Sequence, residues 1–447
     1  MKSKFTEGSI FRHVCVMTFA STAGLLSLFF VDLVDMYWLS LLGVVELAAA
    51  IGYAGSILFF TLSLSIGLSI GCGALVSQSV GRGQVDETSA LVGNLFTIIF
   101  SITLPVSLAV LFAKKWLLTV LGASGPAHEY ASAYLQIILP SLPLLGLAMA
   151  GGGVLRALGN AKEAMYLTLL GGFVNAVLDP VFIFGLGWGI EGAAVASVFA
   201  RIAMLLYGIY RIALVYQLIQ WPVWRRMAAD AQEYFSTALP AVLTNLATPI
   251  GVAYVTAMMA QFGDSAVAGN AIISKVQPLA FAGLFALSAS IGPIAGQNFG
   301  ARNFDRVLET LYSSIKFIAL YSAVACLVMF LLVDLLVVAF KAKDEAEQLI
   351  RWFCYGLSSM FFFGGITFCT NALFNNLRMA HWATIFNFSK ATIFTMPFVL
   401  VGAKWGGPVG IMVGLYIGAA LVAVAGLVMA YYKISRLGAM EQSANVS

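Results

Sequence analysis

Charged residues are scarce in this sequence. Asp, Glu, Lys and Arg make up 10% of its 447 residues, and 61% are hydrophobic. Soluble domains carry about 25% charged and 45–50% apolar residues. A chain of this composition, with a mean hydropathy of +0.93, has too little polar surface to cover itself in water. A soluble enzyme, a disordered chain and a fibre are therefore excluded, and the expected solvent is lipid.

Several chemical motifs are also absent. The five cysteines lie in apolar segments without C-x-x-C spacing, which indicates buried thiols rather than a redox or metal site. The three histidines lie far apart, so they give no metal cluster. No G-x-x-x-x-G-K-[ST] motif occurs, so ATP is not the direct energy source. We find no paired nucleophile and base, and expect no enzyme, no cofactor and no nucleic-acid partner.

Long apolar runs are what the chain does have. A bilayer-spanning helix needs roughly 20 apolar residues, and these runs are too long for the alternating strands of an outer-membrane barrel. Since backbone polar groups must pair inside the bilayer, the spans are expected to be helices. We predict an all-α membrane protein with twelve spans, at 13–40, 47–78, 89–113, 130–152, 163–186, 190–216, 232–261, 266–297, 308–338, 350–374, 381–402 and 407–432.

The basic residues predict the orientation. With the N-terminus in the cytoplasm, fourteen of the 24 Lys and Arg residues fall on the cytoplasmic side, six fall outside and four lie in spans. Positive charge collects on the cytoplasmic side of membrane proteins. Lys2, Lys4 and Arg12 before the first apolar run are typical of an uncleaved start-transfer helix. We expect a multi-pass protein of the cell (inner) membrane with both termini cytoplasmic.

The chain also repeats itself. Gln78–Arg82, followed by Asp86, recurs as Gln297–Ala301, followed by Asp305. The shift from Gln78 to Gln297 is close to half the length of the chain. Six spans separate equivalent positions, so both halves start on the same side of the membrane. The repeat therefore indicates two lobes related by a pseudo-two-fold axis along the membrane normal.

We divide the chain accordingly into an N-lobe at 1–217, a cytoplasmic linker at 218–230 and a C-lobe at 231–447. Two six-helix lobes that form a V around a central cleft are the architecture of alternating-access secondary transporters. A channel would show a pore loop or a selectivity filter, and none stands out.

Ionisable residues inside spans are expensive and usually functional. The N-lobe holds Asp32 and Asp35 in the 13–40 span, three residues apart and roughly on one face. Asn175 and Asp179 are four apart and also share a face. Pro180 follows directly and removes a backbone hydrogen bond, which bends the helix. If the two spans face each other, two carboxylates and an amide converge.

Such a group has two natural uses. Carboxylate, amide and hydroxyl oxygens suit a hard cation such as Na⁺. Alternatively, two carboxylates in a low dielectric cannot both stay ionised, so the pair would share a proton. A structural reading also remains open, in which Asp32 or Asp179 pairs with Arg201 or caps a broken helix.

The C-lobe carries different chemistry at the equivalent positions. At the repeat shift Asp35 corresponds to Tyr254 and Asp179 to Phe398, so the acids are not duplicated. Two lysines lie inside C-lobe spans, and they would line a cavity, contact anionic groups or be structural. The lysines and the amides near them in the sequence are Lys275, Lys390, Asn371, Asn375, Asn376 and Asn387.

At this point the sequence resembles the multidrug and toxic compound extrusion (MATE) transporters. The resemblance covers essentially the whole chain. The segments that carry it are Asp35–Gly43 with Glu46–Ala49, Gln78–Gly81, Leu155–Lys162, Asn175–Gly189 and Gly192–Ser197. The run Leu178–Gly185 resembles the branch named for the DNA-damage-inducible F protein.

The resemblance implies an antiporter that exports amphiphilic, often cationic compounds against an inward flow of H⁺ or Na⁺. It places a cation site, including any Na⁺, at Asp35, Asn175 and Asp179, with Ser197 where relatives usually have Thr. That exchange keeps a hydroxyl. Tyr134 matches a residue that lines the same lobe, and relatives suggest a functional monomer.

The predicted function is thus cation-coupled efflux of small molecules across a lipid membrane. We assign Asp32 and Tyr134 to the substrate cavity in the N-lobe, and Lys275 and Lys390 to it in the C-lobe. The alternative is a lipid or lipid-linked oligosaccharide flippase of the same superfamily, which the two lysines motivate. It predicts binding of a phosphate-headed lipid.

Overall fold

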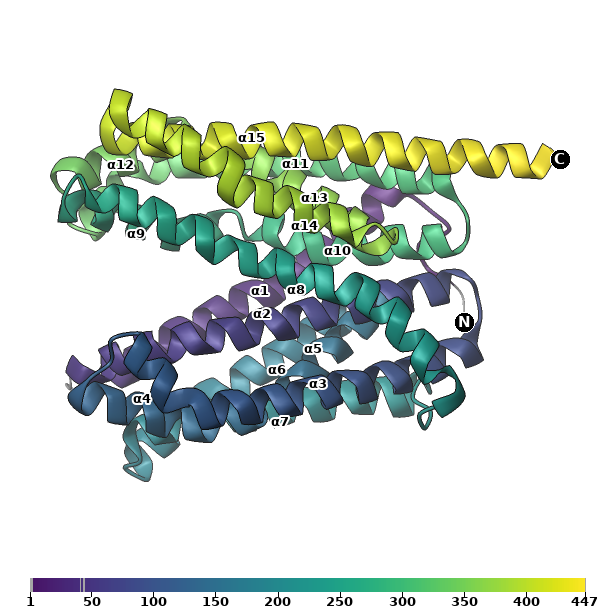
Figure 1. Ribbon diagram of the computed structural model, residues 1–447, viewed down its shortest axis with the longest axis horizontal. Helices are drawn as coiled ribbons and strands as arrows, with labels where there is room; N and C mark the ends of the chain where they lie inside the picture. Colours follow the sequence, from purple (N-terminus) through teal and green to yellow (C-terminus); the bar gives the residue numbers. More distant parts are fainter. Residues whose placement is uncertain (1–2, 41, 43–44, 447) are drawn as a thin grey trace. The chain divides into compact units, whose positions relative to one another are not determined.

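The structure is a computed structural model that describes residues 3–40, 42 and 45–446. Within helices, the side chains of residues 32, 33, 35–37, 39, 40, 45, 48 and 442–446 lie outside this description. In the described part every regular element is a helix, and no strand occurs (Figure 1). The chain is therefore all-α, as its apolar runs predict.

Contacts divide the chain into two compact units. The first unit holds Ala23–Val242, and the second holds Ser3–Thr22 together with the residues from Leu243 on. Two helices therefore contribute to both units. They are α1 (Ile10–Ser40), which begins in the second unit and ends in the first, and α8 (Trp224–Ala260), which does the reverse.

The first unit otherwise consists of α-helices interrupted by one 3₁₀ turn (η1) and two π-helical turns (η2, η3). These are α2 (Val45–Gly81), α3 (Val85–Val120), α4 (Gly125–Ile138), η1 (Leu139–Ser141), α5 (Leu142–Ala157), α6 (Ala161–Pro180), η2 (Val181–Gly185), α7 (Gly189–Ile209) and η3 (Tyr210–Val215). Helix α2 packs on α4 and α5, and α6 packs on α7. The buried centre of this packing is apolar, with Cys72, Leu95 and Leu155 fully enclosed.

The second unit has the same kind of elements. They are α9 (Asp264–Ala280), α10 (Ala282–Gly300), α11 (Phe304–Ala339), α12 (Asp344–Tyr355), η4 (Leu357–Met360), α13 (Phe361–Asn376), α14 (Ala380–Ser389), η5 (Lys390–Phe394) and α15 (Thr395–Val446). Element η4 is a 3₁₀ turn and η5 is a π-helical turn. Helix α13 packs on α10 and α15.

Ten helical segments of the described chain are long and apolar enough to cross a membrane. The number is eleven when α9 and α10, which meet at a bend of 50°, count as one span. The segment Ala380–Glu441 has 62 residues and non-helical backbone at Gly406 and Gly407. That is far more than the roughly 20 residues one span needs. Counted as two spans, it brings the total to the twelve predicted.

Candidate functional site

Asn175 and Asp179 lie in the last turns of α6. Asp179 is fully buried and Asn175 is 5% exposed. The amide Nδ2 of Asn175 donates a hydrogen bond of 3.2 Å to Oδ1 of Asp179. Two residues four apart on a helix lie one above the other, so the contact follows from their spacing. An amide and a carboxylate thus meet inside a membrane-spanning helix.

The backbone changes directly after this pair. Pro180 has no N–H to give to the carbonyl of Ala176, one turn earlier. The N–H of Val181 bonds instead to the carbonyl of Leu178, and the chain continues as the π-helical turn η2. Single π-turns inside helices occur often at functional sites. The helix is therefore irregular next to Asp179, as the proline predicts.

Helix α1 runs alongside α6 in the first unit. A Cβ atom at Gly24 would lie 2.7 Å from Oγ1 of Thr168, and one at Gly172 would lie 2.8 Å from Cγ2 of Val31. Only glycine allows so close an approach. Further along, the rings of Trp38 and Phe184 meet edge to face with centroids 6.0 Å apart. The two helices are thus in contact on both sides of the buried pair.

This register places Asp35 beside the pair. Asp35 lies four residues after Val31 and three before Trp38. Asn175 and Asp179 lie between the opposing contacts, Gly172 and Phe184. Because successive helical residues rise along the axis by equal steps, Asp35 lies at the level of the helical turn that runs from Asn175 to Asp179. The side chains of Asp32 and Asp35 lie outside the described part of the chain.

Ser197 reaches the same level from α7. A Cβ atom at Gly192 would lie 2.7 Å from the carbonyl carbon of Phe182. On the other side of the level, one at Gly171 would lie 2.5 Å from Sδ of Met204. The two helices are antiparallel, so the half-buried Ser197 lies opposite the middle of the Asn175–Asp179 turn. The register brings all four predicted positions to one level of one unit.

Arg201 binds residues outside the group of Asn175, Asp179 and Ser197. Its Nη1 donates to the carbonyl of Ile138 at 3.1 Å and to Oγ of Ser141 at 2.7 Å. Both acceptors lie where the α-helix α4 gives way to the 3₁₀ turn η1. Among the described side chains Arg201 forms no ion pair with Asp179. Arg201 therefore binds the junction of α4 and η1.

Tyr134 lies on α4 and is half-buried. It packs against the apolar cluster that contains Ile183 and Ile190, as does Trp38. The cluster therefore joins the ends of α1, α4, η2 and α7 just beyond Asp179. Tyr134 is thus placed near the predicted site, against this apolar cluster.

The second unit repeats this pairing with other residues. Oγ1 of Thr244 on α8 lies 3.3 Å from Oγ1 of Thr384 on α14. The hydroxyl of Tyr254 donates to the carbonyl of Met396 at 3.4 Å. At the shift of the internal repeat, Tyr254 corresponds to Asp35, and Met396 corresponds to Val177, between Asn175 and Asp179 in the sequence. The position equivalent to Asp35 thus faces the helix equivalent to α6.

The predicted lysines lie on separate elements of the second unit. Lys275 is exposed on α9, and the half-buried Lys390 is the first residue of η5. In the described part of the chain Lys390 has no acidic residue at ion-pair distance. One turn earlier, Asn387 Nδ2 donates to Asn371 Oδ1 at 2.9 Å.

The chemistry available in the first unit is that of oxygen ligands. Among the described residues no group of three His, Cys, Asp or Glu side chains is placed to hold a metal ion. A cation would therefore depend on carboxylate, amide, hydroxyl and backbone oxygens together, which is a set that suits hard ions. The same buried carboxylate would also accept a proton.

The sequence interpretation did not single out the glycines that set the register. Gly171 faces α7 and Gly172 faces α1, so the adjacent pair lets both neighbours approach α6. Small residues have this role where membrane helices pack closely. Two consecutive glycines one turn before Asn175 were the signal available.

Comparison with known families adds an independent finding. A family model described as MatE matches residues 21–181 and 240–401. The starts of the two matches are offset by the same shift as the copies of the internal repeat. Together the matches cover well over half of the chain, and each contains one of the helix pairs described above.

Individual proteins resemble the chain along nearly its whole length. A protein of Shewanella oneidensis named as an FAD transporter is 24% identical, covering 95% of this chain and 94% of its own. The probable multidrug resistance protein YpnP of Bacillus subtilis is 23% identical, covering 98% of both. A crystal structure of a variant of the Vibrio cholerae MATE transporter VcmN is 24% identical and superposes with a TM-score of 0.90, covering 96% of this chain and 97% of that one.

Proposed function

Since this chain belongs to the MatE family, and is therefore a multi-span membrane transporter rather than an enzyme, we propose that it is a secondary active efflux antiporter. It exports amphiphilic small molecules in exchange for H⁺ or Na⁺. The relatives named for multidrug resistance and for FAD transport support a small-molecule cargo. The run Leu178–Gly185 supports a finer placement in the DNA-damage-inducible F-type branch.

The coupling ion binds in the first unit, at Asp35, Asn175, Asp179 and Ser197. The observation that carries this assignment is the hydrogen-bonded pair of Asn175 and Asp179, buried beside a proline and a π-turn. An ion or proton at Asp179 would neutralise its charge and change which bonds hold the end of α6. Because α1 packs on α6 through glycines, a change in one helix would be transmitted to the other.

The residues that we assign to the substrate cavity come from each unit. Asp32 and Tyr134 belong to the first, and Lys275 and Lys390 belong to the second. In the described part of the chain neither lysine has an acidic residue at ion-pair distance, and such lysines disfavour cationic substrates and favour anionic or zwitterionic ones. We further propose that both termini lie in the cytoplasm, that the membrane is the cell (inner) membrane and that the functional form is a monomer.

Counterflow in proteoliposomes tests the proposal. Purified protein is reconstituted with an imposed pH or Na⁺ gradient, and dyes of both charges are followed. Asp35→Asn should abolish gradient-driven efflux while the protein keeps its thermal unfolding midpoint. Retained gradient-driven transport in this variant would exclude the coupling site.

A flippase for lipids or lipid-linked oligosaccharides is the second candidate, because Lys390 lies inside a predicted span without an acidic partner in the described part of the chain. It predicts that a phosphate-headed lipid, and no dye, competes for transport. The same vesicles distinguish the two functions when a fluorescent phospholipid replaces the dye.

A further inference from the structure

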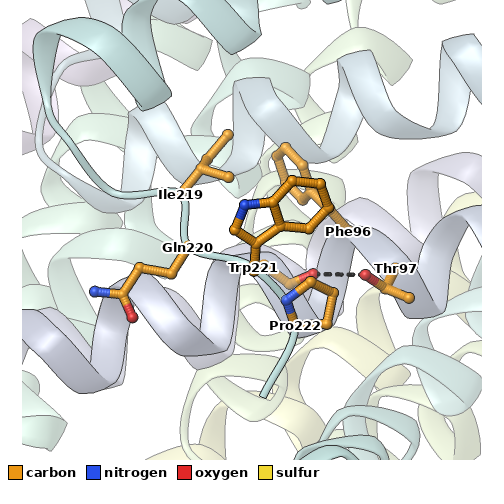
Figure 2. A pocket seen from close by; sticks show the side chains of 7 residues that line it. Phe96, Thr97, Ile219, Gln220, Trp221 and Pro222 are labelled. Atoms are coloured by element: carbon orange, nitrogen blue, oxygen red, sulfur yellow. Dashed lines mark hydrogen bonds between the residues drawn. The ribbon is translucent and has the colours of Figure 1, made fainter. Parts of the chain in front are cut away.

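A groove lies where the segment before α8 crosses α3, away from the predicted coupling site. It is lined by Gly93, Phe96 and Thr97 of α3 and by residues 219–222, and its volume is about 620 Å³. Figure 2 shows the side chains of Phe96, Ile219 and Trp221 around the groove, with Gln220 pointing away from them. The groove is thus mainly apolar, and the exposed indole of Trp221 lies at its rim.

Specific contacts attach the segment before α8, and α8 itself, to α3. Oδ1 of Asn94 on α3 accepts the N–H of Val223 at 2.8 Å, and its Nδ2 donates to Oδ2 of Asp230 at 2.6 Å. A Cβ atom at Gly93 would lie 2.2 Å from the carbonyl oxygen of Gln220, so only glycine admits the crossing segment. The groove is therefore a built feature of the first unit.

The position of the groove along α3 matches one edge of the hydrocarbon core of a bilayer. Phe96 lies five helical turns before Lys114, hence about 27 Å along the helix, which is close to the roughly 30 Å of a hydrocarbon core. A stripe of exposed apolar side chains connects these two levels. It consists of Phe100, Leu104, Leu108 and Phe112, each four residues after the one before, and Phe96 continues it. The groove thus forms the end of a lipid-facing stripe.

Aromatic and basic side chains gather at this end. Trp221 is 92% exposed and Trp224 is 74% exposed, and tryptophans of this kind are enriched where lipid headgroups begin. Arg225 and Arg226 follow and are also exposed. Arg226 Nη2 lies 3.7 Å from Glu87 Oε2, whereas Arg225 has no acidic partner in the described part of the chain. The guanidinium group is well suited to bind phosphate.

We propose that this groove binds a phospholipid with an anionic headgroup. One acyl chain lies along the exposed stripe of α3 and ends at Phe96, while Trp221 covers the glycerol region. The headgroup phosphate lies at Arg225 and Arg226. Charge and depth together select this occupant. A soluble anion would gain nothing from the apolar floor, and the ammonium group of a zwitterionic lipid offsets the attraction of its phosphate to the arginines.

Native mass spectrometry of the delipidated, full-length protein tests the assignment. The protein is titrated with phosphatidylglycerol and, separately, with phosphatidylcholine. The wild type should retain phosphatidylglycerol more tightly. Each arginine near a membrane surface contributes about fivefold in affinity for anionic lipid, so Arg225→Ala combined with Arg226→Ala should weaken phosphatidylglycerol binding about 25-fold. Binding of phosphatidylcholine, which has the phosphate but no net charge, should weaken much less in that variant.

Matched variants separate the groove from the rest of the surface. Lys115→Ala removes an exposed charge at the other end of α3, and Trp405→Ala removes an 88% exposed tryptophan elsewhere. Both should bind phosphatidylglycerol like the wild type. Trp221→Ala should weaken both lipids. The assignment is wrong if the double arginine variant binds phosphatidylglycerol normally, if Lys115→Ala weakens it equally, or if free glycerol 3-phosphate competes as well as the lipid.

Discussion

The two units pair their helices in the same way but place different side chains at the contact. In the first unit α1 packs on α6 through Gly24, Val31 and Gly172. In the second, α8 packs on α14 and the turns after it, through Thr244 and Tyr254. The position held by Asp35 in one unit is held in the other by a tyrosine that donates to a backbone carbonyl.

This difference shows that the helix packing is shared by the two units whereas the polar side chains are not. The neutral hydroxyl of Tyr254 is satisfied by its hydrogen bond to a carbonyl and needs no ion. A buried carboxylate such as that of Asp179 needs an ion or a proton to be neutral. Pro180 and the following π-turn are placed next to the acid, and the equivalent position in the second unit is the buried Val399. The packing is thus shared by the two units, and the acids distinguish the first unit, to which we assign the proposed coupling site.

The largest effect is expected from the acid itself. Asp179→Asn keeps the size of the side chain and removes its charge. Hydrogen bonds to charged groups contribute about 1.5–3 kcal/mol, so gradient-driven efflux should fall about 100-fold. Proteoliposome counterflow measures it. The matched variant is Tyr254→Phe, which loses only the 3.4 Å bond to Met396 and should transport normally. Equal losses in both would remove the distinction between the units.

Helix spacing should matter more in the first unit than in the second. Gly172→Ala places a methyl group 2.8 Å from Val31 Cγ2, and such overpacking costs about 1–3 kcal/mol. We expect a lower thermal unfolding midpoint and about tenfold slower efflux, which corresponds to about 1.4 kcal/mol. In Gly251→Ala the nearest atoms, of Ala391, are 3.8 Å away. A drop of the same size there would contradict the register described above.

Restoring the regular helix should produce a smaller effect. Pro180→Ala supplies an N–H for the carbonyl of Ala176 and makes the first unit more like the second. Efflux should slow a few-fold, while the unfolding midpoint stays the same or rises, because a helix interior favours alanine over proline by about 3 kcal/mol. Unchanged or faster efflux would show that transport does not depend on the irregular helix at Pro180.

The smallest effect concerns substrate charge. Lys390→Gln removes an ammonium group without an acidic partner in the described chain, and should lower export of anionic dyes a few-fold while leaving cationic dyes unchanged. Lys316→Gln is the control, since Lys316 Nζ lies 5.0 Å from the ring centroid of Phe11 and is otherwise exposed. A parallel change in the two variants would argue for a general charge effect.

The apolar runs and the repeat were sufficient to predict an all-helical chain with matching halves. Spacing alone predicted that Asn175 and Asp179 share a face, because residues four apart on a helix are neighbours. The role of Arg201 was not predictable in this way. Its acceptors, at Ile138 and Ser141, are distant in sequence and depend on how α4 breaks.

Contacts between segments that are distant in the sequence could likewise not be predicted from local sequence patterns. Nothing in the sequence near Ser3–Thr22 indicates that this stretch belongs with the second unit. The structure shows why it does, because the N–H of Phe5 donates to Oε1 of Gln297 at 2.9 Å and Asn298 Nδ2 donates to the carbonyl of Phe5 at 3.1 Å. Both partners of Phe5 come from the second copy of the repeated motif.

That attachment has a consequence for how the protein is made. Phe5 and Gln297 are separated by 292 residues. At about 5–20 residues per second, the ribosome needs roughly 15 to 60 s after finishing Phe5 before its partner exists. Arg306, which donates to the carbonyls of Phe5 and Gly8 at 2.9 Å, emerges later still. The segment around Phe5 is thus synthesised well before the residues that hold it in the second unit.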